Sequence, residues 1–203
     1  MVRTFREAPS EKADPIDRAG YVEAGRLTLV LRKVERIDPS KILFSLPTIE
    51  NALPPMREPD SSPAYGMHED EWRQREFVSR QFADEVEWEF AEIHKVWAEQ
   101  EGPGFKRCHV RSKVAEPLRG VEVTLADVSK ALGGIEPVGI TVGGGQVIDG
   151  FAFPLPGGAA YLRLADDSVE SLGLHGDAEP GGLRGLANEH DLVFVDWIGA
   201  SAS

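Results

Sequence analysis

The longest regular pattern of apolar and polar residues in the chain runs from residue 68 to residue 101. At about 100° per residue, its apolar side chains fall within a sector of about 120°, the width typical of a helix that packs on a core. Acids at residues 69–71 suit the positive end of a helix dipole, and the Gly-Pro-Gly at residues 102–104 cannot continue a helix. We therefore expect one long amphipathic helix over residues 68–101. Its apolar stripe contains Trp72, Val78, Phe82, Val86, Phe90, Ile93, Val96 and Trp97.

Shorter patterns on both sides of this helix are typical of strands, because apolar residues alternate with polar ones or form brief runs. In the C-terminal half, turns rich in Gly, Pro and Asp separate these runs, which predicts a β-meander. Two short helices are expected, over residues 125–132, where Thr124 and Asp127 resemble a capping box, and over residues 183–188. The expected strands cover residues 27–34, 42–46, 105–114, 121–123, 138–142, 147–153, 160–164, 169–174 and 192–198.

Together these elements predict an α+β fold, in which a largely antiparallel β-sheet packs against the long helix and one or two short helices. Residues 1–20 mix Pro, Glu, Lys, Ser and Asp without periodicity, which is typical of a flexible tail. We expect residues 21–203 to form a single globular domain, since a chain of this length can bury a sizeable core.

The composition favours a cytoplasmic protein that does not enter a membrane. No apolar run approaches the roughly 20 residues of a membrane span, and the N-terminus lacks the apolar core of a secretory signal. The single cysteine, Cys108, excludes an intrachain disulfide and fits a reducing compartment.

The net charge of −12 argues against direct nucleic-acid binding, because such binding depends on neutralising phosphates with Lys and Arg. The acidity is uneven: residues 68–101 contain 11 acidic and 4 basic residues, and residues 134–203 contain 10 and 2, whereas residues 102–133 contain 3 and 6. Solubility alone accounts for an acidic surface. The sharper hypothesis is a basic protein partner, because complementary fields speed and select encounters.

Glu89 is the first candidate for chemistry, because its position on the helix lies inside the apolar stripe. A carboxylate there must be paired, hydrogen-bonded or protonated. One interpretation is a general acid or base with a raised pKa. The other is a structural pair with a cation such as Arg75, Arg107 or Arg111, or a helix face that is wetter than the stripe suggests.

A basic strip is the second candidate. Alternation over residues 105–114 places Cys108, Val110 and Val114 on one face of a strand and four nitrogen-bearing side chains on the other. This strip could hold a phosphate or carboxylate, with a histidine that titrates near neutral pH. Alternatively, it neutralises the acidic helix or protects a sheet edge. The predicted anion- or ligand-binding residues are Arg107, His109, Arg111 and Lys113.

The back of the predicted helix is the third candidate. Phe77 and Trp88 fall opposite the main apolar stripe, with Asp84 beside them. An exposed aromatic pair can anchor a partner, because aromatic residues dominate binding hot spots. Burial beneath the proline-rich segment 54–63 is the alternative. The predicted partner-binding residues are Phe77, Asp84, Trp88 and Glu92.

The sequence contains no motif of a metal, hydrolase or phosphate site: there is no Cys pair, HExxH, GxSxG, GxGxxG or GK[ST]. We therefore expect no metal, no cofactor and no catalytic residue. The predicted function is a non-catalytic, acidic, cytoplasmic interaction protein that binds a basic protein partner, and neutralisation of that partner is one form such binding could take. The alternative is an anion- or small-molecule-binding domain or enzyme, with a pocket between the long helix and residues 107–113. In that case Glu89 and His109 would be the catalytic residues.

Overall fold

The computed structural model describes residues 5–6, 19–24, 27–32, 45–46, 53–99 and 109–203. The chain divides into two compact units, residues 1–42 with 101–104 and residues 43–100 with 105–203. The boundary expected at residue 20 stays a prediction, because most of the first 20 residues lie outside those described.

In the first unit, three strands pair in an antiparallel sheet in the order β1-β2-β3. Strand β3 lies within residues 27–34, where the alternation of apolar and polar residues predicts a strand. The strands are β1 (Phe5–Arg6), β2 (Ala19–Ala24) and β3 (Leu27–Arg32).

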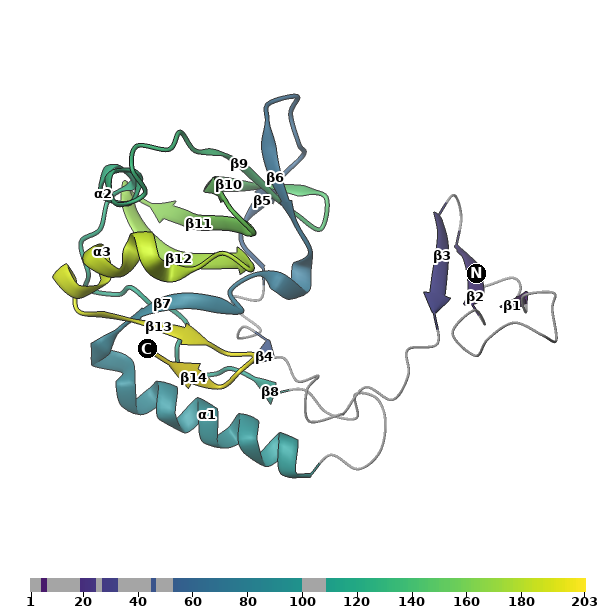
Figure 1. The fold of residues 1–203 in the computed structure, drawn as a ribbon, viewed down its shortest axis with the longest axis horizontal. Coiled ribbons are helices and arrows are strands. Elements are labelled where there is room, and N and C mark those ends of the chain that lie inside the picture. The colour runs from purple at the N-terminus through teal and green to yellow at the C-terminus, as the bar shows by residue number, and fades with distance from the viewer. Residues whose placement is uncertain (1–4, 7–18, 25–26, 33–44, 47–52, 100–108) are drawn as a thin grey trace. The chain divides into compact units, whose positions relative to one another are not determined.

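The second unit is built on a nine-stranded sheet in which neighbouring strands are antiparallel, except that β6 runs parallel to β9 (Figure 1). The expected β-meander is present as β9 to β12, which pair in sequence order. The sheet order is β14-β13-β7-β12-β11-β10-β9-β6, with β5 on β10. The strands are β5 (Met56–Arg57), β6 (Ala64–Met67), β7 (Arg75–Ser79), β9 (Val138–Val142), β10 (Gly145–Leu155), β11 (Gly158–Ala165), β12 (Ser168–Gly176), β13 (Leu192–Asp196) and β14 (Ser201–Ala202).

The α+β fold is therefore confirmed, but the long helix is shorter than its pattern predicts. Helix α1 covers Ala83–Ala98 and follows a 3-10 turn, Arg80–Phe82. Residues 75–79 are strand β7, which pairs with β13 from Ser79 opposite Leu192 to Arg75 opposite Asp196. Arg73, just before β7, has a left-handed backbone with φ of 58°, which an α-helix cannot contain. Residues 75–79 have helical spacing in the sequence but form a strand, because β7 lies between β13 and β12 in the sheet and pairs with both.

The two faces of the sheet bury different clusters of side chains. Helix α1 covers one face, where Val86 and Ile93 pack with Val78, Val195 and Trp197. The other face packs on α2 (Leu125–Ala131) and α3 (Arg184–Glu189), which match the two short helices expected. Figure 1 shows α1 and the pair α2 and α3 on opposite sides of β13.

Two local features complete the second unit. The capping box expected at α2 is present, because Thr124 and Asp127 bond each other's backbone N–H groups. A short parallel pair joins β4 (Ser45–Leu46) to β8 (His109–Val110). Within the described ranges, no helix has the length and apolar character that crossing a membrane requires.

Candidate functional site

A buried carboxylate, Glu76 on β7, lies at the centre of a polar network beneath α1. Its Oε1 accepts hydrogen bonds from Arg111 and from Trp197 Nε1 at 2.9 Å, and its Oε2 accepts one from Arg73 Nε at 2.7 Å. Burial raises the pKa of Glu76, but the charges of Arg73 and Arg111 outweigh burial and hold that pKa below its ordinary value. Glu76 is therefore ionised, and its charge is compensated by two guanidinium groups.

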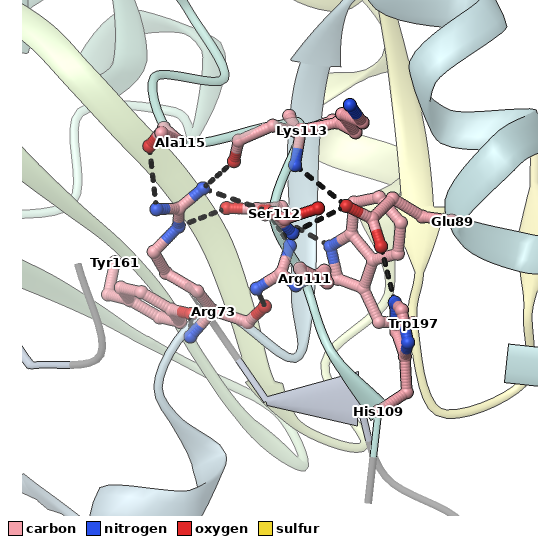
Figure 2. A network of polar contacts seen from close by, with 11 residues as sticks. Arg73, Glu89, His109, Arg111, Ser112, Lys113, Ala115, Tyr161 and Trp197 are labelled. Carbon is pink, nitrogen blue, oxygen red and sulfur yellow. Dashed lines mark hydrogen bonds and ion pairs between the residues drawn. The ribbon is translucent and has the colours of Figure 1, made fainter. Parts of the chain in front are cut away.

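The two arginines of this network fasten residues 111–115 to the sheet (Figure 2). Arg73 donates to the backbone oxygens of Val114 and Ala115 at 3.0 and 2.9 Å. Arg111 donates to the backbone oxygen of Arg73 at 2.8 Å and stacks over the Trp197 ring at 4.3 Å. Because these buried donors of Arg73 and Arg111 are paired with backbone oxygens, the network holds residues 111–115 in one position.

Glu89 and His109, which the sequence analysis names as the catalytic residues if the protein is an enzyme, lie in contact in the structure (Figure 2). Glu89 is fully buried on α1, and one of its oxygens bonds the His109 ring nitrogen Nε2. The other oxygen accepts from the backbone N–H groups of Ser112 at 2.6 Å and Lys113 at 2.7 Å. Both carboxylate oxygens are therefore occupied by this chain's own donors.

The electrostatics of Glu89 favour the structural interpretation. Burial raises its pKa, but the hydrogen bonds from His109 and from the backbone of Ser112 and Lys113 outweigh burial, so the pKa lies below its ordinary value. A general acid at neutral pH needs the opposite shift. Among the described residues, the hydrogen-bond partners of Glu89 are His109 and two backbone N–H groups. Of the arginines that the sequence suggested, Arg111 interacts with Glu89 through its charge, and Arg107 lies outside the described residues.

The predicted basic strip is wrong as a continuous surface. Strand β8 ends at Val110, which is 38% exposed instead of facing inward. Arg111 is buried because Glu76 draws its guanidinium into the network, whereas Lys113 is exposed and lies 5.1 Å from the Trp88 ring centroid. Arg107 lies outside the described residues. The anion site predicted between α1 and residues 107–113 thus loses Arg111, whose guanidinium is bound to Glu76.

The outer face of α1 retains three of the four predicted partner-binding residues. Asp84, Trp88 and Glu92 are four residues apart and so share one side of the helix. The Trp88 side chain is 43% exposed. Phe77 is a correction: it lies on β7, is 1% exposed and packs against Phe194 with ring centroids 5.2 Å apart. It belongs to the core because β7 is a strand.

The sequence analysis did not predict two features of the structure, the contacts of His175 and a cavity. His175 Nδ1 lies 2.8 Å from the Tyr65 hydroxyl, and its Nε2 lies 2.9 Å from Glu71, a distance of an ion pair. A cavity also opens over β11 and β12, beside Arg163 and Ser171. Both assemble residues that are about a hundred positions apart, so that only the sheet topology reveals them.

The described part of the chain contains no group of three or more His, Cys, Asp or Glu side chains arranged to hold a metal ion. Comparison with protein families, with curated proteins and with solved structures finds no match to this chain. The function must therefore be argued from the geometry above.

Proposed function

We propose that this protein is a non-catalytic interaction protein that binds a basic protein partner through the outer face of α1. The observation that carries the proposal is the half-exposed ring of Trp88 between the carboxylates of Asp84 and Glu92. An exposed tryptophan beside two carboxylates can anchor a basic partner, because the ring supplies apolar contact and the charges select the partner.

The charge of the helix supports a basic partner. Helix α1 contains five acidic residues and one basic residue, Lys95, which pairs with Glu92. Of the acids, only Glu89 is buried, so the others contribute to the field outside the protein. With a net charge of −12 over the whole chain, this field attracts a basic protein and repels an acidic one.

The buried contacts of α1 support a rigid binding face. Glu89 fastens the middle of α1 to the backbone of Ser112 and Lys113, which places the Lys113 ammonium over the Trp88 ring. A cation over the ring face restricts the orientation of the indole. A side chain that is already ordered loses less entropy when a partner binds, so the anchor is preorganised.

The same contacts favour a non-catalytic role. Glu89 bonds His109 and the backbone of Ser112 and Lys113, which leaves neither of its carboxylate oxygens free to take a proton from a substrate. Their role in this proposal is to position α1.

The test is a comparative capture of partners from the protein's own cells. We would compare the wild-type protein, the variant Trp88→Ala, the double variant Asp84→Lys/Glu92→Lys, and the control Glu122→Lys/Glu136→Lys. The control makes the same change in charge at two exposed acids outside α1. Captured proteins are identified by mass spectrometry, and the affinity of the leading one is then measured with purified components.

The expected result is a basic protein that the wild type and the control bind equally. Its affinity for the Trp88→Ala variant falls at least about 30-fold, the loss of a hot-spot residue worth about 2 kcal/mol. A partner that binds all four proteins alike, or one that is lost equally from the control, would refute binding through this face.

A further inference from the structure

A cavity of about 510 Å³ opens on the second unit, on the face of the sheet that carries Tyr161. Its floor is formed by β11 and β12, where Arg163 lies directly opposite Ser171. Trp72, Arg73 and residues 115–117 form its sides. Cavities of this size are typical of sites for small molecules.

One part of the cavity lining is apolar. It is formed by Leu53, Pro54 and Pro55, and the neighbouring Trp72 stacks on Tyr161 with ring centroids 4.9 Å apart. Ring and proline surfaces of this kind suit the C–H faces of a compact molecule. The cavity therefore offers one polar side and one apolar side to the same occupant.

Ser171 carries a hydroxyl that has no partner within the described part of the chain. The residue is 4% exposed, and its Oγ is buried without a hydrogen bond. Burial of a hydroxyl without a hydrogen bond costs folding free energy, and almost all such groups in proteins are paired. Because Ser171 lines the cavity, a change of its side-chain rotamer can turn this unpaired hydroxyl toward an occupant.

The ion pair between Arg163 and Glu170 gives the cavity hydrogen-bond donors and acceptors next to each other. Arg163 donates to Glu170 through Nε at 2.8 Å and through Nη2, so the two groups lie in one plane. The remaining terminal nitrogen, Nη1, takes part in no hydrogen bond within the ranges described. Arg163 and Glu170 are partly exposed and face the cavity that they line.

Among the described residues that line the cavity, two are basic (Arg73 and Arg163) and two are acidic (Glu116 and Glu170), so their formal charges sum to zero. Arg163 pairs with Glu170, and Arg73 pairs with Glu76, which Arg111 shares. The one further charged residue that lines the cavity, Glu116, is exposed and acidic. An anion meets Glu116 and Glu170, and a cation meets two guanidinium groups, so neither is favoured. A neutral molecule with several hydroxyl groups can bond the donors and the acceptors together.

We propose that this cavity binds a neutral, hydroxyl-rich small molecule of the saccharide or polyol class. Its hydroxyl groups bond Ser171 Oγ, Arg163 Nη1 and the Glu170 carboxylate. Its C–H face packs on the apolar wall of residues 53–55. This site is separate from the outer face of α1, and it does not depend on the function proposed for that face.

The test is a titration with defined probes, followed by two-dimensional NMR of the ¹⁵N-labelled full chain. The neutral probes are maltose, trehalose, N-acetylglucosamine and myo-inositol, and the anionic probes are glucuronate and glucose 6-phosphate. The variants are Ser171→Ala and Arg163→Met. The matched control is Arg80→Met, which removes an arginine from an exposed ion pair with Asp191.

At least one neutral probe is expected to saturate, with shifts at Trp72 and Ser171 and with binding tighter than both anionic probes. Arg163→Met weakens this binding about tenfold or more, and Ser171→Ala weakens it about threefold to tenfold, the worth of one hydrogen bond. Arg80→Met leaves it unchanged. Ser171→Ala also gives a second signature, because removing an unpaired hydroxyl leaves the melting temperature of the ligand-free protein equal or higher.

Three results would overturn the proposal. The first is the absence of saturable binding by every neutral probe. The second is tighter binding of the anionic probes. The third is binding that persists unchanged in Arg163→Met and Ser171→Ala, which both retain the fold as judged from their amide spectra.

Discussion

The substitution Glu76→Gln tests whether the buried network beneath α1 is ionic. The amide keeps the shape of the carboxylate but removes its charge, and it presents an NH₂ group to guanidinium N–H groups that also donate. Arg73 and Arg111, each no more than 5% exposed, then lose the charge that compensates them.

The expected loss is large. Removal of one partner from a buried ion pair costs about 3–5 kcal/mol, because the other partner stays buried and uncompensated. Here one carboxylate serves two guanidinium groups and the Trp197 indole, so we expect the upper part of that range. The control Glu92→Gln breaks an exposed pair with Lys95 and should cost less than about 1 kcal/mol.

The assay is urea unfolding followed by tryptophan fluorescence, repeated from pH 7 to pH 3. Because the pKa of Glu76 is lower in the folded chain than in the unfolded chain, its contribution is complete above the unfolded value of about 4.3. The contribution is lost as the pH falls through the folded pKa. Glu76→Gln should therefore lower stability at pH 7 and flatten its decrease in acid. A loss within about 1 kcal/mol of the Glu92→Gln control, with an unchanged acid slope, would refute an ionic network.

Three further predictions concern single positions. Glu89→Gln should lower the free energy of unfolding by about 1–3 kcal/mol at pH 7 and by less in acid, measured by the same assay, since its carboxylate accepts from His109 and two backbone N–H groups. Equal losses at both pH values would contradict an ionised Glu89. Phe77→Ala should lower the free energy of unfolding by about 3–5 kcal/mol, because Phe77 is a core residue. Trp88→Ala should change the free energy of unfolding, measured by calorimetry, by less than about 1.5 kcal/mol. A larger loss for Trp88→Ala than for Phe77→Ala would contradict the burial of Phe77. Gly173→Ala should lower the melting temperature by several degrees, since a Cβ there lies 2.6 Å from the Tyr161 ring, and unchanged melting would show that this close packing is absent.

The C-terminal meander was predictable because local signals agree there. Strands such as residues 160–164 alternate or form short apolar runs, and the turns between them contain residues that accept a left-handed backbone. Gly143 and Gly144, between β9 and β10, both have positive φ, and so do Asp166 and Asp167, between β11 and β12. Element type and turn position could therefore be inferred residue by residue.

Strand β7 could not be inferred in this way, because its residues fit two periods. Val78 and Phe82 are four apart, as on a helix, while Glu76 and Val78 alternate with Phe77, as on a strand. Pairing with β13 decides between them, and that pairing joins positions more than a hundred residues apart. The misassigned period also concealed Glu76 and turned Phe77 into an apparent surface residue.

In the candidate sites too, features that depend on local sequence could be predicted, and features that depend on contacts between distant segments could not. The burial of Glu89 was predictable, since its angle on the helix lies within the apolar stripe. Its partner was not, because the end of β8 at Val110 determines which residues turn inward. The saccharide cavity combines residues from four separate segments, and only its ion pair between Arg163 and Glu170, seven positions apart across one hairpin, had a local origin.

The most direct test of binding through α1 is hydroxyl-radical footprinting of the tryptophans, read by mass spectrometry. Trp88 is 43% exposed, whereas Trp197 is buried and serves as an internal reference. We would compare the purified protein with the same protein isolated in native complexes from its own cells. Binding through this face predicts that Trp88 oxidation falls several-fold in the native sample while oxidation of Trp197 stays unchanged. Trp88 oxidation that is equal in both samples would contradict it.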